Sequence, residues 1–148
     1  VSVKHFCCNN QEDNRVGVSA NVSQRALREV YLRAFRIAVT EGKPWTVMSS
    51  YNRVNGHYVC NSFDLCTRVL RQEWGFRGLV MSDWNATEQC SYSEAIHAGN
   101  DLIMPGTASV SKALEKSLKA GELDRDALNL SAGRVLELIF KSETCQSF

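Results

Sequence analysis

The sequence predicts an α/β fold, a parallel (β/α) half-barrel of about four βα units that forms part of a TIM-like barrel. Two observations lead to this prediction. Short β-rich runs alternate with amphipathic helical segments along the chain, and this alternation favours a parallel sheet with right-handed crossovers. Four such units make half of an eight-stranded barrel, whose complete form holds about 250 residues. This chain has 148 residues.

The first unit begins with a strand over residues 1–6 and a polar loop over about 9–21. A helix is predicted next, over about 23–41, because apolar residues recur there at helical spacing. Gly42 and Pro44 end this helix, since both are stop signals. The apolar residues of the expected buried face are Leu27, Tyr31, Ala34, Phe35 and Ala38.

The second unit has a strand over 45–51, a turn at Asn55-Gly56 and a helix over about 63–74. Asn-Gly is a strong turn signal, and a glycine directly after the helical pattern ends the helix. The third unit has an apolar strand over 79–83 and a short helix over about 92–97.

The fourth unit has a strand over 101–104 and a helix over about 110–120. A last helix is expected to begin at Asp124, a good N-cap residue, and to run to about Phe140. The tail after Ser142 is expected to be frayed.

A half-barrel leaves two unpaired strand edges. We therefore expect the chain to pair with another copy of itself, to close with a missing barrel half, or to be a fragment of a larger protein. Its length fits one domain over residues 1–148.

Composition and charge argue against several classes of partner. The chain has 17 basic and 16 acidic residues, a formal net charge of +1 and no block of Lys or Arg, so nothing favours nucleic acid or an anionic membrane. No stretch approaches the roughly 18 apolar residues of a membrane span. The first residues lack an apolar signal core, so we expect a cytoplasmic protein.

The cysteines form no C-x-x-C pair and no zinc pattern. We interpret them as free, buried thiols of a reducing compartment, and we expect no metal and no cofactor. A metal site built from His5, Cys7 and Cys8 stays open as an alternative. The six cysteines are Cys7, Cys8, Cys60, Cys66, Cys90 and Cys145.

Polar residues lie at or near the ends of the predicted strands, and in a parallel barrel the carboxyl ends of the strands share one face. Amines and imidazoles donate hydrogen bonds to hydroxyl groups, carboxylates accept them, and an aromatic face covers the apolar face of a sugar ring. The pattern therefore predicts a site for a neutral polyhydroxyl ligand. Its residues are Lys4 and His5, then Ser50, Tyr51 and Asn52, then Asp83 and Trp84, and last Asp101 and Met104.

The motifs themselves resemble glycoside hydrolase family 3, in particular the bacterial and yeast β-glucosidases. The similarity covers the chain from Lys4 to about Phe140. It is carried by five ordered motifs: Lys4-His5-Phe6; Asn9-Asn10-Gln11-Glu12 with Arg15; Met48-Ser49-Ser50-Tyr51-Asn52 with Asn55-Gly56; Glu73-Trp74-Gly75-Phe76 with Gly78; and Ser82-Asp83-Trp84.

This resemblance implies that residues 1–148 are the C-terminal half of the family's N-terminal barrel domain. It also implies that Asp83 is the catalytic nucleophile, that Lys4 and His5 bind sugar hydroxyls and that Tyr51 lies close to the nucleophile. The expected substrate is a β-glucoside, as a small molecule or an oligosaccharide.

Two residues match the lining of the family's sugar pocket, and two more match a pair that supports it. Met48 and Trp84 correspond to residues that line it, with the tryptophan reaching toward the leaving group. Glu12 and Arg15 correspond to a supporting pair, with Arg15 near the sugar. Asn85 stands where the family often has glycine, and asparagine is the best substitute if that position needs a positive φ.

A retaining glycosidase needs two carboxyl groups about 5–5.5 Å apart, one as nucleophile and one as acid/base. The resemblance places the acid/base glutamate in a later domain and the rest of the sugar pocket in the earlier barrel half. Both lie outside this sequence. We expect Glu88, Glu94 and Asp101 to stay outside the catalytic set, and we expect little or no turnover from the isolated chain.

Each assignment also has a structural alternative. Asp83 could cap the helix that follows it, His5 could be a core histidine and Lys4 a solvated charge. Tyr51 and Trp84 could be core aromatics. Met48 is expected to be partly core, and Trp45 and Trp74 to be packing residues.

Three other functions stay open. The chain could be a non-catalytic sugar-binding or scaffold half-barrel, or its specificity could be that of a β-xylosidase. A phosphate-binding barrel enzyme would need a Gly-rich loop before a helix N-terminus, and the sequence shows none.

Overall fold

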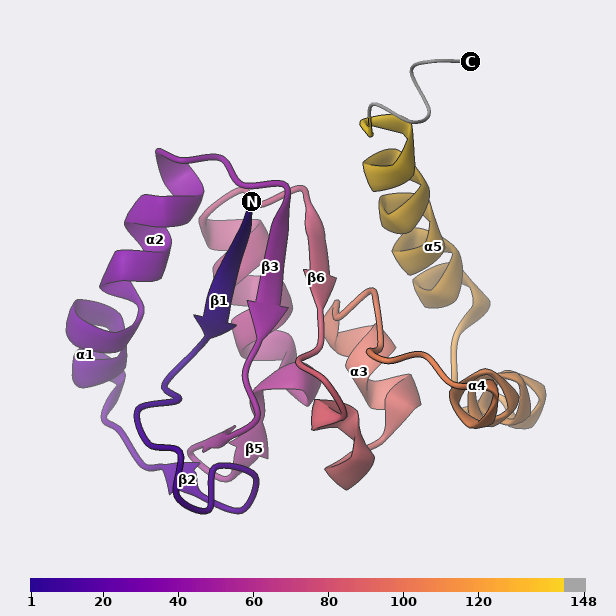
Figure 1. The fold of residues 1–148 in the computed structure, drawn as a ribbon, viewed down its shortest axis with the longest axis horizontal. Coiled ribbons are helices and arrows are strands. Elements are labelled where there is room, and N and C mark those ends of the chain that lie inside the picture. Colours follow the sequence, from indigo (N-terminus) through magenta and orange to yellow (C-terminus); the bar gives the residue numbers. More distant parts are fainter. Residues whose placement is uncertain (143–148) are drawn as a thin grey trace.

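The computed structural model describes residues 1–142 and shows a parallel sheet with helices packed beside and behind it (Figure 1). Three strands form this sheet, in the order β1 (Ser2–Phe6), β3 (Thr46–Ser49) and β6 (Leu79–Met81). All three run in the same direction. The predicted α/β class and parallel sheet are therefore confirmed.

The fourth predicted strand, over 101–104, is shorter than expected. It makes one parallel bridge, between Leu102 and Met81. Hydrogen bonds nevertheless hold it along β6, since the Leu102 N–H donates to the Val80 carbonyl at 3.1 Å and the Ser82 N–H donates to the Leu102 carbonyl at 2.9 Å. The segment therefore takes the fourth position of the half-barrel.

A second, small sheet lies within segments expected to be a loop and a turn. Its strands are β2 (Ser19–Ala20), β4 (Arg53–Val54) and β5 (His57–Tyr58), in the order β2-β4-β5. Asn55 and Gly56 both have positive φ, 50° and 90°, as a tight two-residue hairpin requires. Two-residue strands carry no periodic signal, which is why sequence patterns missed this sheet.

The first long helix is divided into α1 (Gln24–Ala26), η1 (Leu27–Tyr31) and α2 (Arg33–Thr40). In η1 the Leu32 N–H donates to the Leu27 carbonyl, five residues back. This wide turn rotates the residues after it, so that Leu32 and Val39 are buried while Ala34 is exposed. The predicted buried face was wrong at Ala34 for this reason.

The remaining helices are η2 (Val59–Asn61), η3 (Asp64–Glu73), η4 (Ala86–Gln89), α3 (Tyr92–Ala98), α4 (Ala108–Ala120) and α5 (Arg125–Phe140). Of these, η3, α3, α4 and α5 lie close to their predicted ranges, whereas the short 3-10 turns η2 and η4 were not predicted. Asp124 is the N-cap of α5, as predicted, and its side chain accepts a hydrogen bond from the Asp126 N–H. The prediction for the tail lies outside the described residues.

The main core lies between the larger sheet and the helices α2 and η3. Phe6, Val47 and Val80 from the strands meet Val39 and Leu70 from the helices. Burying side chains of this size stabilises the fold by about 1.5–3 kcal/mol each. The core therefore fixes the strand ends from which the polar residues extend.

Trp74 packs against this core and contacts the Phe6 ring edge-on, with 6.0 Å between the centroids. Trp45, by contrast, is exposed, so its predicted packing role was wrong. It directly precedes β3, at the end of the sheet opposite to the one that carries Asp83.

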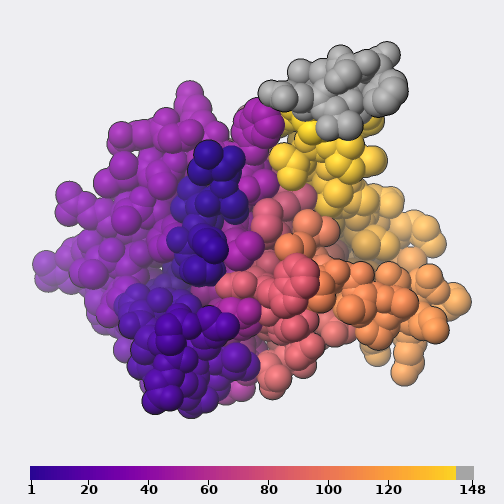
Figure 2. All heavy atoms as spheres, in the orientation of Figure 1, coloured from indigo at the N-terminus to yellow at the C-terminus, as the bar shows by residue number. Residues whose placement is uncertain are grey.

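One edge of the sheet is unpaired within residues 1–142, because β1 pairs with β3 on one side alone. The indigo N-terminal segment is visible at the surface in Figure 2, beside the magenta and pink segments that follow it. None of the helices in the described part of the chain is both long and apolar enough for a membrane crossing.

Candidate active site

Asp83 lies two residues past the end of β6, on the face of the sheet where the parallel strands end. Its N–H donates to the Ser49 carbonyl at the end of β3, at 3.2 Å. The preceding Ser82 side chain is buried and accepts a hydrogen bond from the Met104 N–H at 2.8 Å. Neighbouring strands on both sides therefore hold the backbone that carries the carboxylate.

The carboxylate of Asp83 is 15% exposed and faces the imidazole of His5, with 3.4 Å between Oδ2 and Nε2. His5 comes from β1, two strands away in the sheet. The other oxygen, Oδ1, accepts a hydrogen bond from the adjacent Trp84 N–H at 2.7 Å. Asp83 is therefore not the N-cap of η4, and His5 is not a core histidine.

Tyr51 joins this group from the segment after β3. Its hydroxyl donates to the Trp84 carbonyl at 2.5 Å, so it is bound to the backbone directly beside Asp83. The Arg15 guanidinium lies over the Tyr51 ring, 4.2 Å from the centroid, and also pairs with Glu12 at 2.6 Å. The predicted Glu12–Arg15 pair thus positions one face of the tyrosine ring.

The surroundings of Tyr51 raise its pKa above the usual value. Burial is the largest cause, the negative charge of Asp83 is the second, and the Arg15 charge acts in the opposite direction. The phenol therefore stays protonated at neutral pH and can act as a hydrogen-bond donor.

The effect of the Asp83 charge on the pKa of Tyr51 can be measured. We expect the titration of tyrosinate absorbance, taken as the difference between the protein and its Tyr51→Phe variant, to show an ionisation above the usual tyrosine range. Replacing Asp83 by Asn should lower that pKa, because the like charge is removed while burial remains. An unchanged titration in Asp83→Asn would mean that the carboxylate does not act on the phenol.

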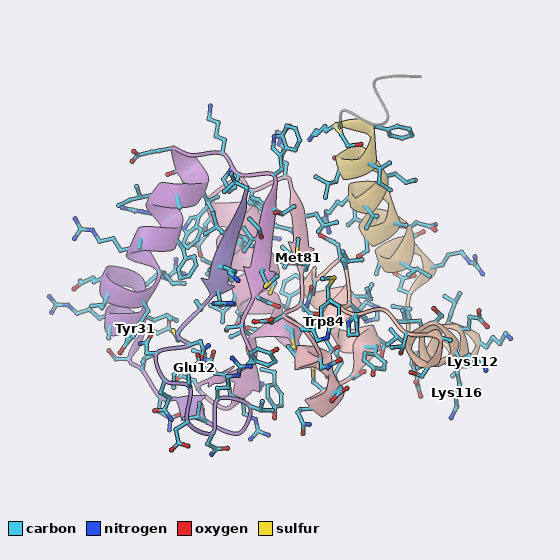
Figure 3. The ribbon with its side chains drawn as sticks, in the orientation of Figure 1. Glu12, Tyr31, Met81, Trp84, Lys112 and Lys116 are labelled. Atoms are coloured by element: carbon cyan, nitrogen blue, oxygen red, sulfur yellow. The ribbon has the colours of Figure 1, made fainter. Side chains whose placement is uncertain are left out.

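Other predicted site residues stand apart from these contacts. Lys4 is exposed, and its side chain forms no hydrogen bond or ion pair among residues 1–142. Met48 is half-buried in β3 beside Met81. Trp84 is 55% exposed, so it is not a core aromatic, and Figure 3 shows it just past the strand end beyond Met81.

Asp101 lies away from this face, although the rim pattern had included it. Its carboxylate is buried and pairs with Arg71 at 2.5 Å and with Arg134 at 2.7 Å. It also accepts hydrogen bonds from the Val80 N–H and the Ser131 hydroxyl. Asp101 therefore has a supporting role, as expected for a residue outside the catalytic set.

Two polar residues that the strand-end pattern had included in the site, Ser50 and Asn52, instead hold the loop after β1. The Ser50 hydroxyl and the Asn52 amide both donate to the Cys7 carbonyl, at 2.9 and 3.3 Å. Both residues are buried. The sequence signal for them is a run of polar residues directly after an apolar strand. Burying such polar groups costs free energy unless each one finds a hydrogen-bond partner.

The metal alternative at His5, Cys7 and Cys8 finds no support in this geometry. His5 faces Asp83, and Cys8 Sγ lies 3.8 Å from the buried Cys7 Sγ. Within residues 1–142, no group of three or more His, Cys, Asp or Glu side chains could hold a metal ion.

The loop after Asp83 depends on Asn85, which has a positive φ of 61°. This confirms that residue 85 adopts the left-handed conformation that favours glycine and, after glycine, asparagine. We expect Asn85→Ala to lower the free energy of unfolding by about 1 kcal/mol, because a Cβ without a local hydrogen-bonding group is strained there. Asn85→Gly is the matched control and should lose less. Equal losses in a denaturant titration of the two variants would contradict this explanation.

The comparison with known families agrees with the geometry. The model of the glycosyl hydrolase family 3 N-terminal domain matches residues 1–138. This chain belongs to that family. Members of known structure share its fold closely: β-glucosidase 3B from Thermotoga neapolitana, solved in complex with glucose, has a TM-score of 0.91 and is 43% identical, over 99% of this chain and 21% of that chain.

Other family 3 relatives give the same result. The β-glucosidase from Kluyveromyces marxianus, also solved with glucose, has a TM-score of 0.88 and is 38% identical over 93% of this chain and 17% of that chain. A probable β-glucosidase K from Emericella nidulans is 40% identical over 98% of this chain and 17% of its own length.

One similar relative is named for an activity other than that of a β-glucosidase. An exo-α-(1→6)-L-arabinopyranosidase from Bifidobacterium breve is 40% identical over 99% of this chain and 19% of its own length. The chain thus spans about a fifth of the length of the relatives that it matches.

Proposed function

We propose that this chain carries the catalytic nucleophile, Asp83, of a retaining glycosidase that hydrolyses terminal non-reducing β-D-glucosyl residues. The observation that carries the proposal is the position of the Asp83 carboxylate, which is partly exposed at the strand ends and faces His5 at 3.4 Å. Family membership and the names of the relatives support glycosidase chemistry.

In the proposed mechanism, Asp83 attacks the anomeric carbon while the bond from that carbon to the leaving oxygen breaks. A second carboxyl group, which we propose lies outside this chain, protonates the leaving oxygen. It then takes a proton from water, which attacks the glycosyl-enzyme ester and releases Asp83 with overall retention. The isolated chain should therefore turn over little or no substrate, since general acid–base help is worth about 10²–10⁴-fold in rate.

The neighbouring residues would bind and orient the sugar. We assign hydroxyl binding to Lys4 and His5, the lining of the pocket to Met48, and stacking near the leaving group to the exposed indole of Trp84. Arg15 would act by holding the Tyr51 ring, over which its guanidinium lies.

The remainder of the sugar pocket and of the barrel would come from other parts of the same protein, next to the unpaired edge of β1. A non-catalytic sugar-binding role is the main alternative. A protein of that kind would bind glucose without hydrolysing any glycoside.

The test is covalent trapping on the full-length protein. A 2-deoxy-2-fluoro-β-D-glucoside with a good leaving group should leave a glycosyl ester on the proteolytic peptide that contains Asp83, as detected by mass spectrometry. Asp83→Asn should lose the label, and Glu88→Gln, which changes an exposed carboxylate of the same loop, should keep it. A label on another carboxylate would refute the assignment.

Hydrolysis assays on the same preparations separate the specificities. We expect an aryl β-glucoside to be cleaved faster than the matching β-xyloside and α-L-arabinopyranoside. The arabinopyranoside is included because one similar relative carries that name. Faster cleavage of either pentoside would change the substrate without changing the proposed nucleophile.

A further inference from the structure

Two cysteines from different loops lie in contact. The Sγ atoms of Cys60 and Cys90 are 3.2 Å apart, although 30 residues separate them in sequence. Cys60 lies in η2, and Cys90 directly follows η4. A disulfide has an S–S distance of about 2.05 Å, so a shift of little more than 1 Å would bring the two sulfurs to bonding distance.

The two loops are the ones that carry candidate active-site residues. The loop that reaches Cys60 begins after β3 and contains Tyr51, while the loop that reaches Cys90 begins after β6 and contains Asp83 and Trp84. The Tyr51–Trp84 hydrogen bond already joins them at one end. A bond between Cys60 and Cys90 would join them at the other.

We propose that Cys60 and Cys90 form a reversible disulfide that clamps the Asp83 loop to the Tyr51 loop. The oxidant is a low-molecular-weight disulfide. This bond is independent of hydrolysis, so the proposal does not rest on the function proposed above.

The accessibility of the two thiols sets the order of the steps. Cys60 is fully buried, whereas Cys90 is half-buried and lines an open cavity of about 550 Å³. The Cys90 thiolate attacks one sulfur of the small disulfide, breaks its S–S bond and releases one thiol. Cys60 then attacks Cys90 Sγ and releases the second. Two electrons pass to the small disulfide, and the two thiol protons end on the released thiols.

The other thiols of residues 1–142 are less suited to this reaction. Cys66 is fully buried, and its thiol already donates to the Val59 carbonyl at 3.1 Å. Cys7 and Cys8 are adjacent in sequence, and their sulfurs are 3.8 Å apart. Cys60 and Cys90 therefore form the pair closest to bonding distance among these thiols.

The experiment oxidises the full-length protein with oxidised glutathione. The hydrogen bond to Cys60 and then burial raise the pKa of the Cys90 thiol, so the reaction is run at about pH 9 to increase the thiolate fraction. Free thiols are then alkylated, and the unreduced digest is mapped by mass spectrometry. We expect a cross-linked peptide joining Cys60 to Cys90 and the loss of two alkylatable thiols, both reversed by dithiothreitol.

Two variants sharpen the result. Cys90→Ser, at a half-buried position that tolerates a polar group, should lose the cross-link, and Cys145→Ser should keep it. Hydrogen exchange provides the readout for the clamp: oxidation should slow exchange at the amides of residues 84–90 in the unmodified sequence and not in Cys90→Ser. Alkylation of both thiols after oxidation, a stable glutathione adduct on Cys90, or unchanged exchange in the cross-linked protein would each overturn the proposal.

Discussion

We expect Asp83→Asn to lower the kcat for hydrolysis of an aryl β-glucoside by about 10⁴-fold or more, because an amide cannot form the glycosyl ester on which the proposed mechanism depends. The substitution keeps the size of the side chain. The N–H of residue 83 can still donate to the Ser49 carbonyl, and the oxygen of the new amide can still accept from the Trp84 N–H. The fold should therefore be little affected.

Glu88→Gln is the matched control for this experiment. It removes one negative charge from an exposed position in the same loop and should leave kcat within a few-fold of the starting value. A circular dichroism spectrum and an unfolding midpoint close to those of the unmodified protein would show that Asp83→Asn is folded. A folded Asp83→Asn variant with nearly full activity would rule out Asp83 as the nucleophile.

The second large effect concerns stability. The buried carboxylate of Asp101 joins three elements, because it pairs with Arg71 of η3 and Arg134 of α5 and accepts a hydrogen bond from the Val80 N–H of β6. We expect Asp101→Asn to lower the free energy of unfolding by about 3–5 kcal/mol, because it leaves two largely buried guanidinium groups without a counter-charge. A denaturant titration of the folded protein measures this loss.

The position of α5 depends strongly on these contacts. Ser131 is its one buried residue, while Leu130, Leu136, Ile139 and Phe140 are exposed. Little apolar burial is therefore available within residues 1–142 to replace the ion pairs, and α5 should be the first element to loosen in the variant.

Asp64→Asn is the control for Asp101→Asn. It breaks an ion pair between Asp64 and Arg68, four residues apart on η3, in which both side chains are more than half exposed. Exposed pairs of this kind contribute about 0.2–1 kcal/mol. Losses of similar size in the two variants would show that burial does not give Asp101 its special role.

Much of the fold could be predicted because its signals are local. Apolar spacing marked the long helices, Gly75 and Gly99 marked helix ends, and Asp124 marked a helix start, all within a few residues of their observed positions. Where a local pattern was broken, the prediction was wrong. The wide turn η1 moved the buried face of the first helix from Ala34 to Leu32 and Val39.

The candidate site could be predicted as a set of residues but not as a set of contacts. Parallel strands bring their carboxyl ends together, so His5, Tyr51 and Asp83 were expected to be neighbours. The pattern did not show that the Tyr51 hydroxyl donates to the Trp84 carbonyl, or that the Lys4 side chain forms no hydrogen bond or ion pair within residues 1–142. These outcomes depend on loop paths and side-chain directions.

By itself, the sequence determined the α/β class, the order of the elements and the resemblance to glycoside hydrolase family 3, because hydrophobic periodicity, turn residues and short motifs are written along the chain. The tertiary structure alone decided which polar groups pair. Asp101 meets arginines 30 and 33 residues away, and Cys60 meets a thiol 30 residues away. Such pairs form because packing fixes where distant loops and helices cross, and no local pattern carries that information.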